Sequence, residues 1–166
     1  IRLIILIKIM DNILKIIGLL ETQRGVFSDI EEITRRMLDE DIENFSPLLE
    51  ERGKLLEKAV SIEEEIRLIS HEDQRIGDVL GNRCDMTAIP DDLAKVFEAS
   101  MRVKAIINRI KNMEEDIRLR MEAEREAILK KIESLNVSSN SVAGNYKRAV
   151  QTGFPQSHLG EGKKTV

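Results

Sequence analysis

The sequence predicts an all-α protein: an elongated bundle of three long antiparallel helices with a coiled-coil-like hairpin and a flexible C-terminal tail. Two features of the composition support this fold class. Aromatic residues make up only 3% of the 166 residues, whereas hydrophobic residues reach 42% and charged residues 34%, which is the composition of long helices and coiled coils. The third observation is that apolar residues recur at three- and four-residue spacing over long segments, as on one face of a helix.

The length suits a single domain. We expect the helical bundle to occupy residues 1–135, with helices at about 1–39, 42–73 and 91–135. Residues 136–166 are expected to form a mostly flexible tail, because Ser, Asn, Gly and Lys dominate there. A helical turn within residues 142–150 remains an option.

The first helix raises a question at its glycines. Gly18 and Gly25 lie seven residues apart on one face. Either they allow another helix to approach closely, or Gly25 interrupts the helix. In the second case Ser28 and Glu31 form a capping-box pattern that would restart it. The sequence leaves a kink near Gly25 and a continuous helix equally open.

Residues 1–20 are apolar on most of the helix circumference. Charged residues at positions 2, 8, 11 and 15 interrupt them too often for a transmembrane helix of roughly 20 apolar residues, so no membrane span is predicted. A helix of this kind is buried on several sides, by the core or by a partner. The alternative is a helix that lies in a membrane interface.

The second helix begins either at Asp41 or at Ser46, where Pro47 would take the first helical position. Its apolar residues repeat every seven positions, which is a coiled-coil-like heptad pattern. They are Leu48, Leu55, Ile62 and Ile69. Turn residues at Gly77, Gly81-Asn82 and Pro90 then break the pattern, and the third helix starts at Asp91 or Asp92.

Charges on the second and third helices also recur every seven residues and predict how the two helices meet. An antiparallel hairpin centred on Cys84 would set an acidic stripe beside a basic one. The expected pairs are Glu43 with Arg125, Glu50 with Arg118, Glu57 with Lys111, and Glu64 with Lys104.

The sequence offers little that could perform catalysis. His71-Glu72-Asp73 lacks a second histidine at metal-binding spacing, and no Gly-rich phosphate loop is present. Cys84 is the only cysteine, so we expect a reduced thiol and a cytoplasmic protein. We therefore predict no enzyme activity, no catalytic residue, no metal site and no cofactor. The net charge of −4 gives no support for a nucleic-acid partner, and none is predicted.

The third helix is the predicted working surface. Met113 and Met121 lie on its apolar stripe, and methionine is common on adaptable helix-binding surfaces. The alternative is that these methionines fill the core. Three long helices rarely bury every apolar position, so we expect either self-association or a groove for a partner helix.

The segment DIENFSPLLEERGKLLEKAV, preceded by EEITRRMLDE, resembles the signature region of flagellar export chaperones of the FlgN/FliT type. An acidic residue opens the helix, an aromatic follows, and two Leu-Leu pairs flank a basic residue. The matching positions are Asp41, Ile42, Phe45, Leu48, Leu49, Arg52, Leu55 and Leu56. The later segments EAEREAILKKIESLN and VAGNYKRAV are similar to the C-terminal end of that group. The resemblance covers about residues 10–150.

This resemblance implies a cytoplasmic chaperone of flagellar type III secretion, a monomer or dimer. It would bind the C-terminal amphipathic helical segment of a secreted hook-associated or filament-cap subunit and prevent premature assembly. It also implies contact with the export ATPase apparatus. By position, the client-binding residues would be Ile110, Met113, Ile117, Met121, Ile128, Ile132, Leu135 and Tyr146. The alternative is a structural coiled-coil or adaptor protein that self-associates through its heptad faces.

Overall fold

The computed structural model describes residues 1–151 and the side chains up to Arg148. The chain divides into two compact units, Ile1–Arg120 and Met121–Val166. The helices are α1 (Arg2–Asp39), the short 3-10 helix η1 (Ile42–Asn44), α2 (Phe45–Glu72), α3 (Gln74–Leu80) and α4 (Asp91–Gln151). Within residues 1–151 there is no β-strand, which confirms the all-α prediction.

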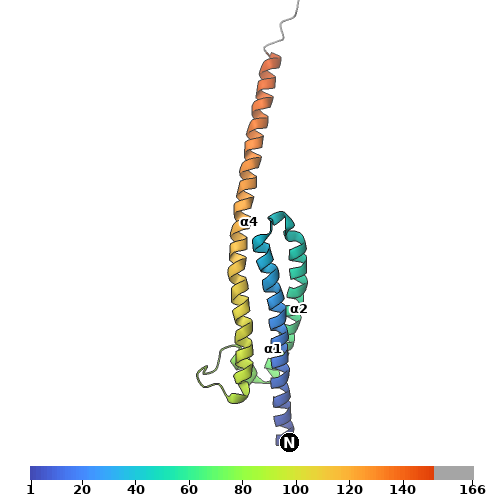
Figure 1. The fold of residues 1–166 in the computed structure, drawn as a ribbon, viewed down its shortest axis with the longest axis vertical. Coiled ribbons are helices and arrows are strands. Elements are labelled where there is room, and N and C mark those ends of the chain that lie inside the picture. The colour runs from blue at the N-terminus through green and yellow to red at the C-terminus, as the bar shows by residue number, and fades with distance from the viewer. Residues whose placement is uncertain (152–166) are drawn as a thin grey trace, which may run out of the picture. The chain divides into compact units, whose positions relative to one another are not determined.

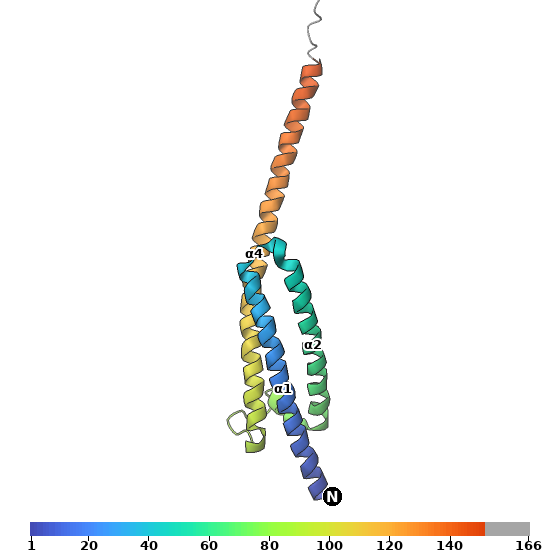
Figure 2. The same cartoon turned by 45° about the vertical axis from the view of Figure 1, so that its right-hand side comes forward.

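Three long helical segments build the first unit, and their directions alternate (Figures 1 and 2). Helix α2 runs antiparallel to α1, and the first part of α4 returns alongside α1 in the same direction as α1. Ion pairs of α4 with α1 follow this direction, because Arg102 reaches Glu21 and Arg109 reaches Glu31. The predicted antiparallel arrangement therefore describes α2 against its neighbours, whereas α1 and α4 are parallel.

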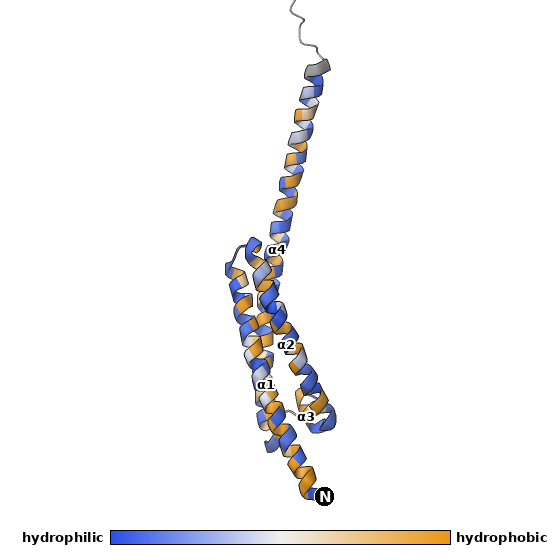
Figure 3. Ribbon diagram, turned by 90° about the vertical axis from the view of Figure 1, so that its right-hand side faces the viewer, coloured by the Kyte–Doolittle hydropathy of each residue, from blue (hydrophilic) through white to orange (hydrophobic). Residues whose placement is uncertain are grey.

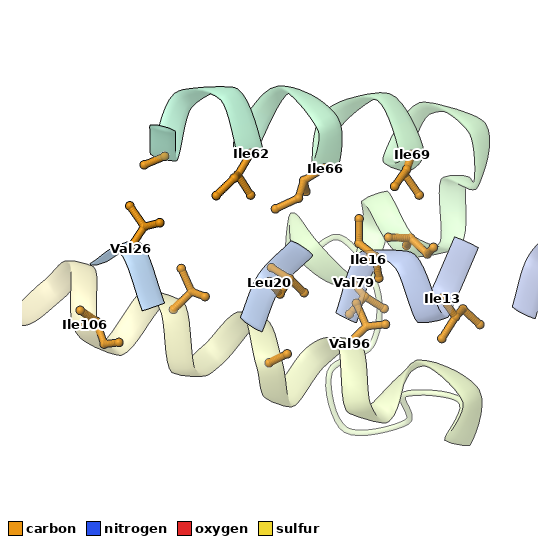
Figure 4. Close-up of a cluster of buried hydrophobic side chains, with 14 of the residues drawn as sticks. Ile13, Ile16, Leu20, Val26, Ile62, Ile66, Ile69, Val79, Val96 and Ile106 are labelled. Carbon is orange, nitrogen blue, oxygen red and sulfur yellow. The ribbon is translucent and has the colours of Figure 1, made fainter. Parts of the chain in front are cut away.

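The central core lies among α1, α2, α3 and α4, and branched aliphatic side chains dominate it (Figure 4). Ile16, Ile76 and Val96 are completely buried. The heptad residues Ile62 and Ile69 of α2 point into this core, as their spacing predicts. Burial of these apolar side chains is the main source of the unit's stability.

A second apolar cluster closes the end of the unit where α1 turns into α2. It contains Ile33, Met37, Phe45, Leu48 and Ile117. Arg120 of α4 completes this end. Its Nη1 donates hydrogen bonds to the main-chain oxygens of Met37 (3.0 Å) and Leu38 (2.6 Å), and its Nη2 donates to that of Glu40 (2.9 Å). The last carbonyls of a helix have no partner within the helix, and a cation there also offsets the helix dipole.

Helix α1 is continuous through both of its inner glycines. A Cβ atom added at Gly18 or Gly25 would meet nothing within 4 Å outside the adjacent helix backbone. Neither glycine therefore serves a close helix contact, and Gly25 does not interrupt the helix. A close helix contact at the glycines and an interruption at Gly25 are both wrong, whereas the continuous helix, which the sequence also allowed, is observed. Ser28 and Glu31 do not restart a helix.

The charge pairing expected between α2 and α4 is not the one observed. Glu50 pairs with Lys54 and Glu64 with Arg67, each within α2, and Arg118 pairs with Glu115 within α4. An ion pair that does join α2 to α4 has the opposite polarity, because Arg52 contributes the cation and Glu114 the anion.

The reason for this difference is that α4 has a second neighbour. Its arginines at positions 102 and 109 form ion pairs with carboxylates of α1. The predicted hairpin centred on Cys84 considered only α2 and α4 and left α1 out. Lys104 is used elsewhere, since its Nζ donates to the main-chain oxygen of Leu80 at 3.1 Å.

The predicted break between the second and third helices contains a short helix, α3. Asp73 caps it by accepting a hydrogen bond from the main-chain N–H of Arg75 at 3.1 Å, and Gly77, read as a turn residue, lies inside it. The turn follows at Gly81 and at Asn82, whose φ of 54° is left-handed. Helix α4 begins at Asp91, one of the two predicted starts.

Helix α4 extends to Gln151, past the predicted end near Leu135. Residues 136–151 contain no proline, and the hydroxyl of Ser141 donates to the main-chain oxygen of Ser138 at 2.8 Å, so this serine bonds within the helix instead of opposing it. The rest of the expected tail, residues 152–166, lies outside the described part of the chain.

A search of the described helices for a membrane-crossing segment is negative: none combines the length and the apolar character that crossing a membrane requires.

Candidate protein-binding surface

The eight residues predicted to bind a partner fall into two groups in the structure. Ile110 and Ile117 are each only 6% exposed and belong to the central core and the second cluster. Met113 is half-buried and packs against the central core. These three residues stabilise the first unit, so they do not form an accessible binding surface.

The other five residues lie in the second unit and are accessible. Met121, Ile128 and Ile132 are 46%, 50% and 48% exposed, and Leu135 and Tyr146 are 61% and 74% exposed. Val142 is also exposed and falls on the same line of residues. Its position seven residues after Leu135 could have identified it from the sequence. We call this set of Met121, Ile128, Ile132, Leu135, Val142 and Tyr146 the α4 stripe.

The α4 stripe has the spacing of a coiled-coil seam. Met121, Ile128, Leu135 and Val142 follow one another every seven residues. Ile132 and Tyr146 occupy the second heptad position, which Arg125 and Ser139 also take. Apolar residues at these two positions of each heptad form the contact line of paired helices. Orange and blue segments accordingly alternate along this part of α4 (Figure 3).

Charges are unequally placed along the stripe. Its beginning carries Glu122, Glu124 and Glu126 beside Arg125, whereas its end carries Lys147 and Arg148. Because one end of the stripe is acidic and the other is basic, a partner helix is favoured in one orientation over the other. A helix that pairs with it gains most when its own charges run the opposite way.

The start of α1 is a second exposed apolar surface. Residues 3–7 and Met10 are each more than half exposed, and the first buried residue of the helix is Ile13. Burial in this chain's own core, one of the expectations from the sequence, is therefore wrong for these first turns. Burial by a partner and contact with a membrane interface stay as predictions. Lys8 forms an exposed ion pair with Glu72 of α2, at 3.4 Å.

A shallow cavity of about 510 Å³ lies where α2 meets α3. Arg67 and Arg83 line it, but Arg67 pairs with Glu64 and Arg83 with Asp78. His71 also lines it, so the polar cluster noted in the sequence lies beside this exposed cavity.

A smaller cavity, of about 220 Å³, lies among α1, α2 and α4. Gln23 donates to the carboxylate of Glu63 there at 2.7 Å. Ser100 also lines it, and its buried hydroxyl has no hydrogen-bond partner among the described residues. Neither cavity was predicted. The smaller one forms between segments distant in the sequence, whereas the larger one forms where α2 and α3 fold against each other within residues 63–83.

Among residues 1–151, no group of three or more His, Cys, Asp and Glu side chains is placed to hold a metal ion. The α4 stripe is the accessible apolar surface with regular heptad spacing among the described residues. No protein-family model matches the chain, and no curated protein or solved structure matches it either.

Proposed function

We propose that this chain is a helical chaperone that masks an amphipathic helix of another protein on the α4 stripe. The observation that carries the proposal is the run of accessible apolar residues at heptad spacing from Met121 to Tyr146. Amphipathic helices recognise each other through such lines of apolar anchors. The function is binding, without turnover and without a cofactor.

The client follows from the resemblance to flagellar export chaperones in the segment Asp41–Val60. On that basis it is the C-terminal amphipathic helix of a secreted hook-associated or filament-cap subunit. The chaperone would keep this helix masked in the cytoplasm until export, with the export ATPase apparatus as a further partner. In the structure the segment with the resemblance supports the first unit, since Phe45 and Leu48 belong to its second cluster.

The apolar contact available is consistent with a reversible complex. Completing the burial of a half-exposed aliphatic side chain stabilises by roughly 1 kcal/mol, given about 1.5–3 kcal/mol for full burial. Six such residues supply several kcal/mol before the entropy lost on association is subtracted. We therefore expect weak and reversible binding, suited to a client that must be released.

The test is calorimetric titration of the full chain with peptides from the C-terminal helices of secreted flagellar subunits. The double variant Ile128→Asp/Ile132→Asp should weaken binding at least tenfold, because two charges would enter the apolar contact. The cooperative thermal unfolding of its first unit should stay unchanged, since neither residue belongs to a core. The matched control is Val137→Asp, an exposed residue two positions after Leu135 and hence nearly opposite it on the helix.

Full binding by the double variant would exclude the α4 stripe as the client site. If no flagellar C-terminal helix binds the unmodified chain, the client class is wrong. The remaining candidate is then the structural coiled-coil or adaptor protein that the same heptad spacing suggested.

A further inference from the structure

We propose that a second copy of this chain covers the α4 stripe, as an antiparallel two-stranded coiled coil over residues 121–148. The contact would be isologous, with the same surface used by both copies. It does not depend on the proposed client, because it is derived from the stripe's own spacing and charges.

The first argument is coverage. An antiparallel pair whose two-fold axis passes between Glu133 and Ser134 places Met121 against Tyr146 of the second copy, and Ile132 against Leu135 of the second copy. Ile128 then faces Ser139 of the second copy, and Val142 faces Arg125. In this one register every apolar residue of the stripe gains a neighbour from the other copy, within residues 121–148 alone.

The second argument is the pair of polar residues in the seam. A parallel pair would stack Arg125 on Arg125 and Ser139 on Ser139, which brings two like charges into the contact line. In the antiparallel pair each polar residue faces an apolar one. The aliphatic part of Arg125 can pack on Val142 of the second copy while its guanidinium reaches water. Polar seam residues of this kind select register and orientation in coiled coils.

The third argument is charge complementarity. In this register Glu124 and Glu126 lie opposite Ala143 and Ser141 of the second copy, and Lys147 of the second copy follows about one helical turn beyond Ala143. Parallel pairing would instead bring glutamates beside glutamates. Each exposed pair stabilises only weakly, so these charges choose the orientation while the apolar contacts hold the two copies together.

The dimer would compete with any partner helix, because both need the same residues. A client would have to displace the second copy, so its apparent affinity would fall as the protein concentration rises. Self-pairing thus keeps the stripe masked while no client is present.

The first experiment is sedimentation equilibrium of the full chain without any client. A concentration-dependent monomer–dimer equilibrium is expected. Ile132→Asp should shift the dissociation constant upward at least tenfold, whereas Val137→Asp should leave it unchanged. A chain that stays monomeric at high concentration would overturn the proposal, as would equal weakening by both variants.

The second experiment fixes the orientation in a Cys84→Ser background. Chains carrying Met121→Cys are mixed with chains carrying Tyr146→Cys and oxidised. Disulfide-linked pairs should form between the two variants, and neither variant should link to itself. Efficient linking of Met121→Cys chains to one another would show a parallel pair and overturn the register. A chain that stays monomeric but still binds the flagellar peptides would overturn the dimer and leave the proposed chaperone function standing.

Discussion

At the residue scale, Glu31 and Arg109 form the best-aligned ion pair between α1 and α4. Arg109 donates through Nε at 2.7 Å and through Nη2 at 3.0 Å to the two carboxylate oxygens of Glu31. Such paired hydrogen bonds are stronger and more directional than single ones. The Glu31 side chain is only 12% exposed, whereas that of Arg109 is 54% exposed.

Hydrogen bonding from Arg109 lowers the pKa of Glu31, and the charges of Arg109 and Arg35 act in the same direction. The folded carboxyl therefore has a lower pKa than the unfolded one, which is about 4.3. The stabilisation is present above that value and is lost as the pH falls through the folded pKa. Glu31→Gln should lower the Tm by a few degrees near pH 7 and make the Tm fall less between pH 5 and pH 3, as measured by thermal circular dichroism.

Glu32→Gln is the control, because Glu32 is exposed and pairs with Arg35 of its own helix at 2.6 Å. Its acid profile should follow that of the unmodified chain. If Glu31→Gln kept the full acid-dependent loss of Tm, the pair with Arg109 would not contribute to stability.

At the scale of the element, one residue of α1, Gly25, lowers the stability of the helix and can be replaced. Gly25 is exposed in the middle of the helix, and a Cβ there has open space around it. Glycine in a helix costs roughly 0.5–1 kcal/mol relative to alanine, because the unfolded chain has more freedom to lose. Gly25→Ala should therefore raise the free energy of unfolding by that amount, measured by urea denaturation with an unchanged slope.

Gly77→Ala in α3 provides the contrast. A Cβ there would lie 3.1 Å from the main-chain oxygen of Ser70, which is tighter than ordinary contact, so a stabilisation by the full amount is not expected. A loss of stability in Gly25→Ala would mean that this part of α1 needs the glycine, against the open geometry.

The same helices show what the sequence could predict. The limits of α1 and the start of α4 at Asp91 were predicted, because periodicity and first-turn residues act locally. The sequence could not predict which turns of α4 are covered by the other helices. Ile110 and Ile128 look alike in the pattern, yet Ile110 is buried by neighbouring helices and Ile128 is exposed. The end of α4 was misjudged because serine and asparagine lower helix propensity only slightly.

At the scale of the whole molecule, the two units differ in what stabilises them. Each buried hydrophobic residue of the described chain lies between Ile13 and Ile117, within the first unit. The described residues of the second unit are helical, and nearly all of their side chains are exposed. Isolated helices of this kind are marginal in water even with good helix formers.

Hydrogen exchange should therefore separate the two units in the full chain. At low protein concentration, amides around Ile16–Ile30 and Val96–Ile110 should exchange only through global unfolding, since they lie in the central core. Amides of residues 122–148 should exchange at least a hundredfold faster, through local fraying. Raising the concentration, or adding a client helix, should slow exchange in residues 122–148 alone, because only that segment gains a covering partner. Equal protection of both units in dilute solution would mean that the second unit is stable without any partner, and the masking role of the α4 stripe would lose its physical reason.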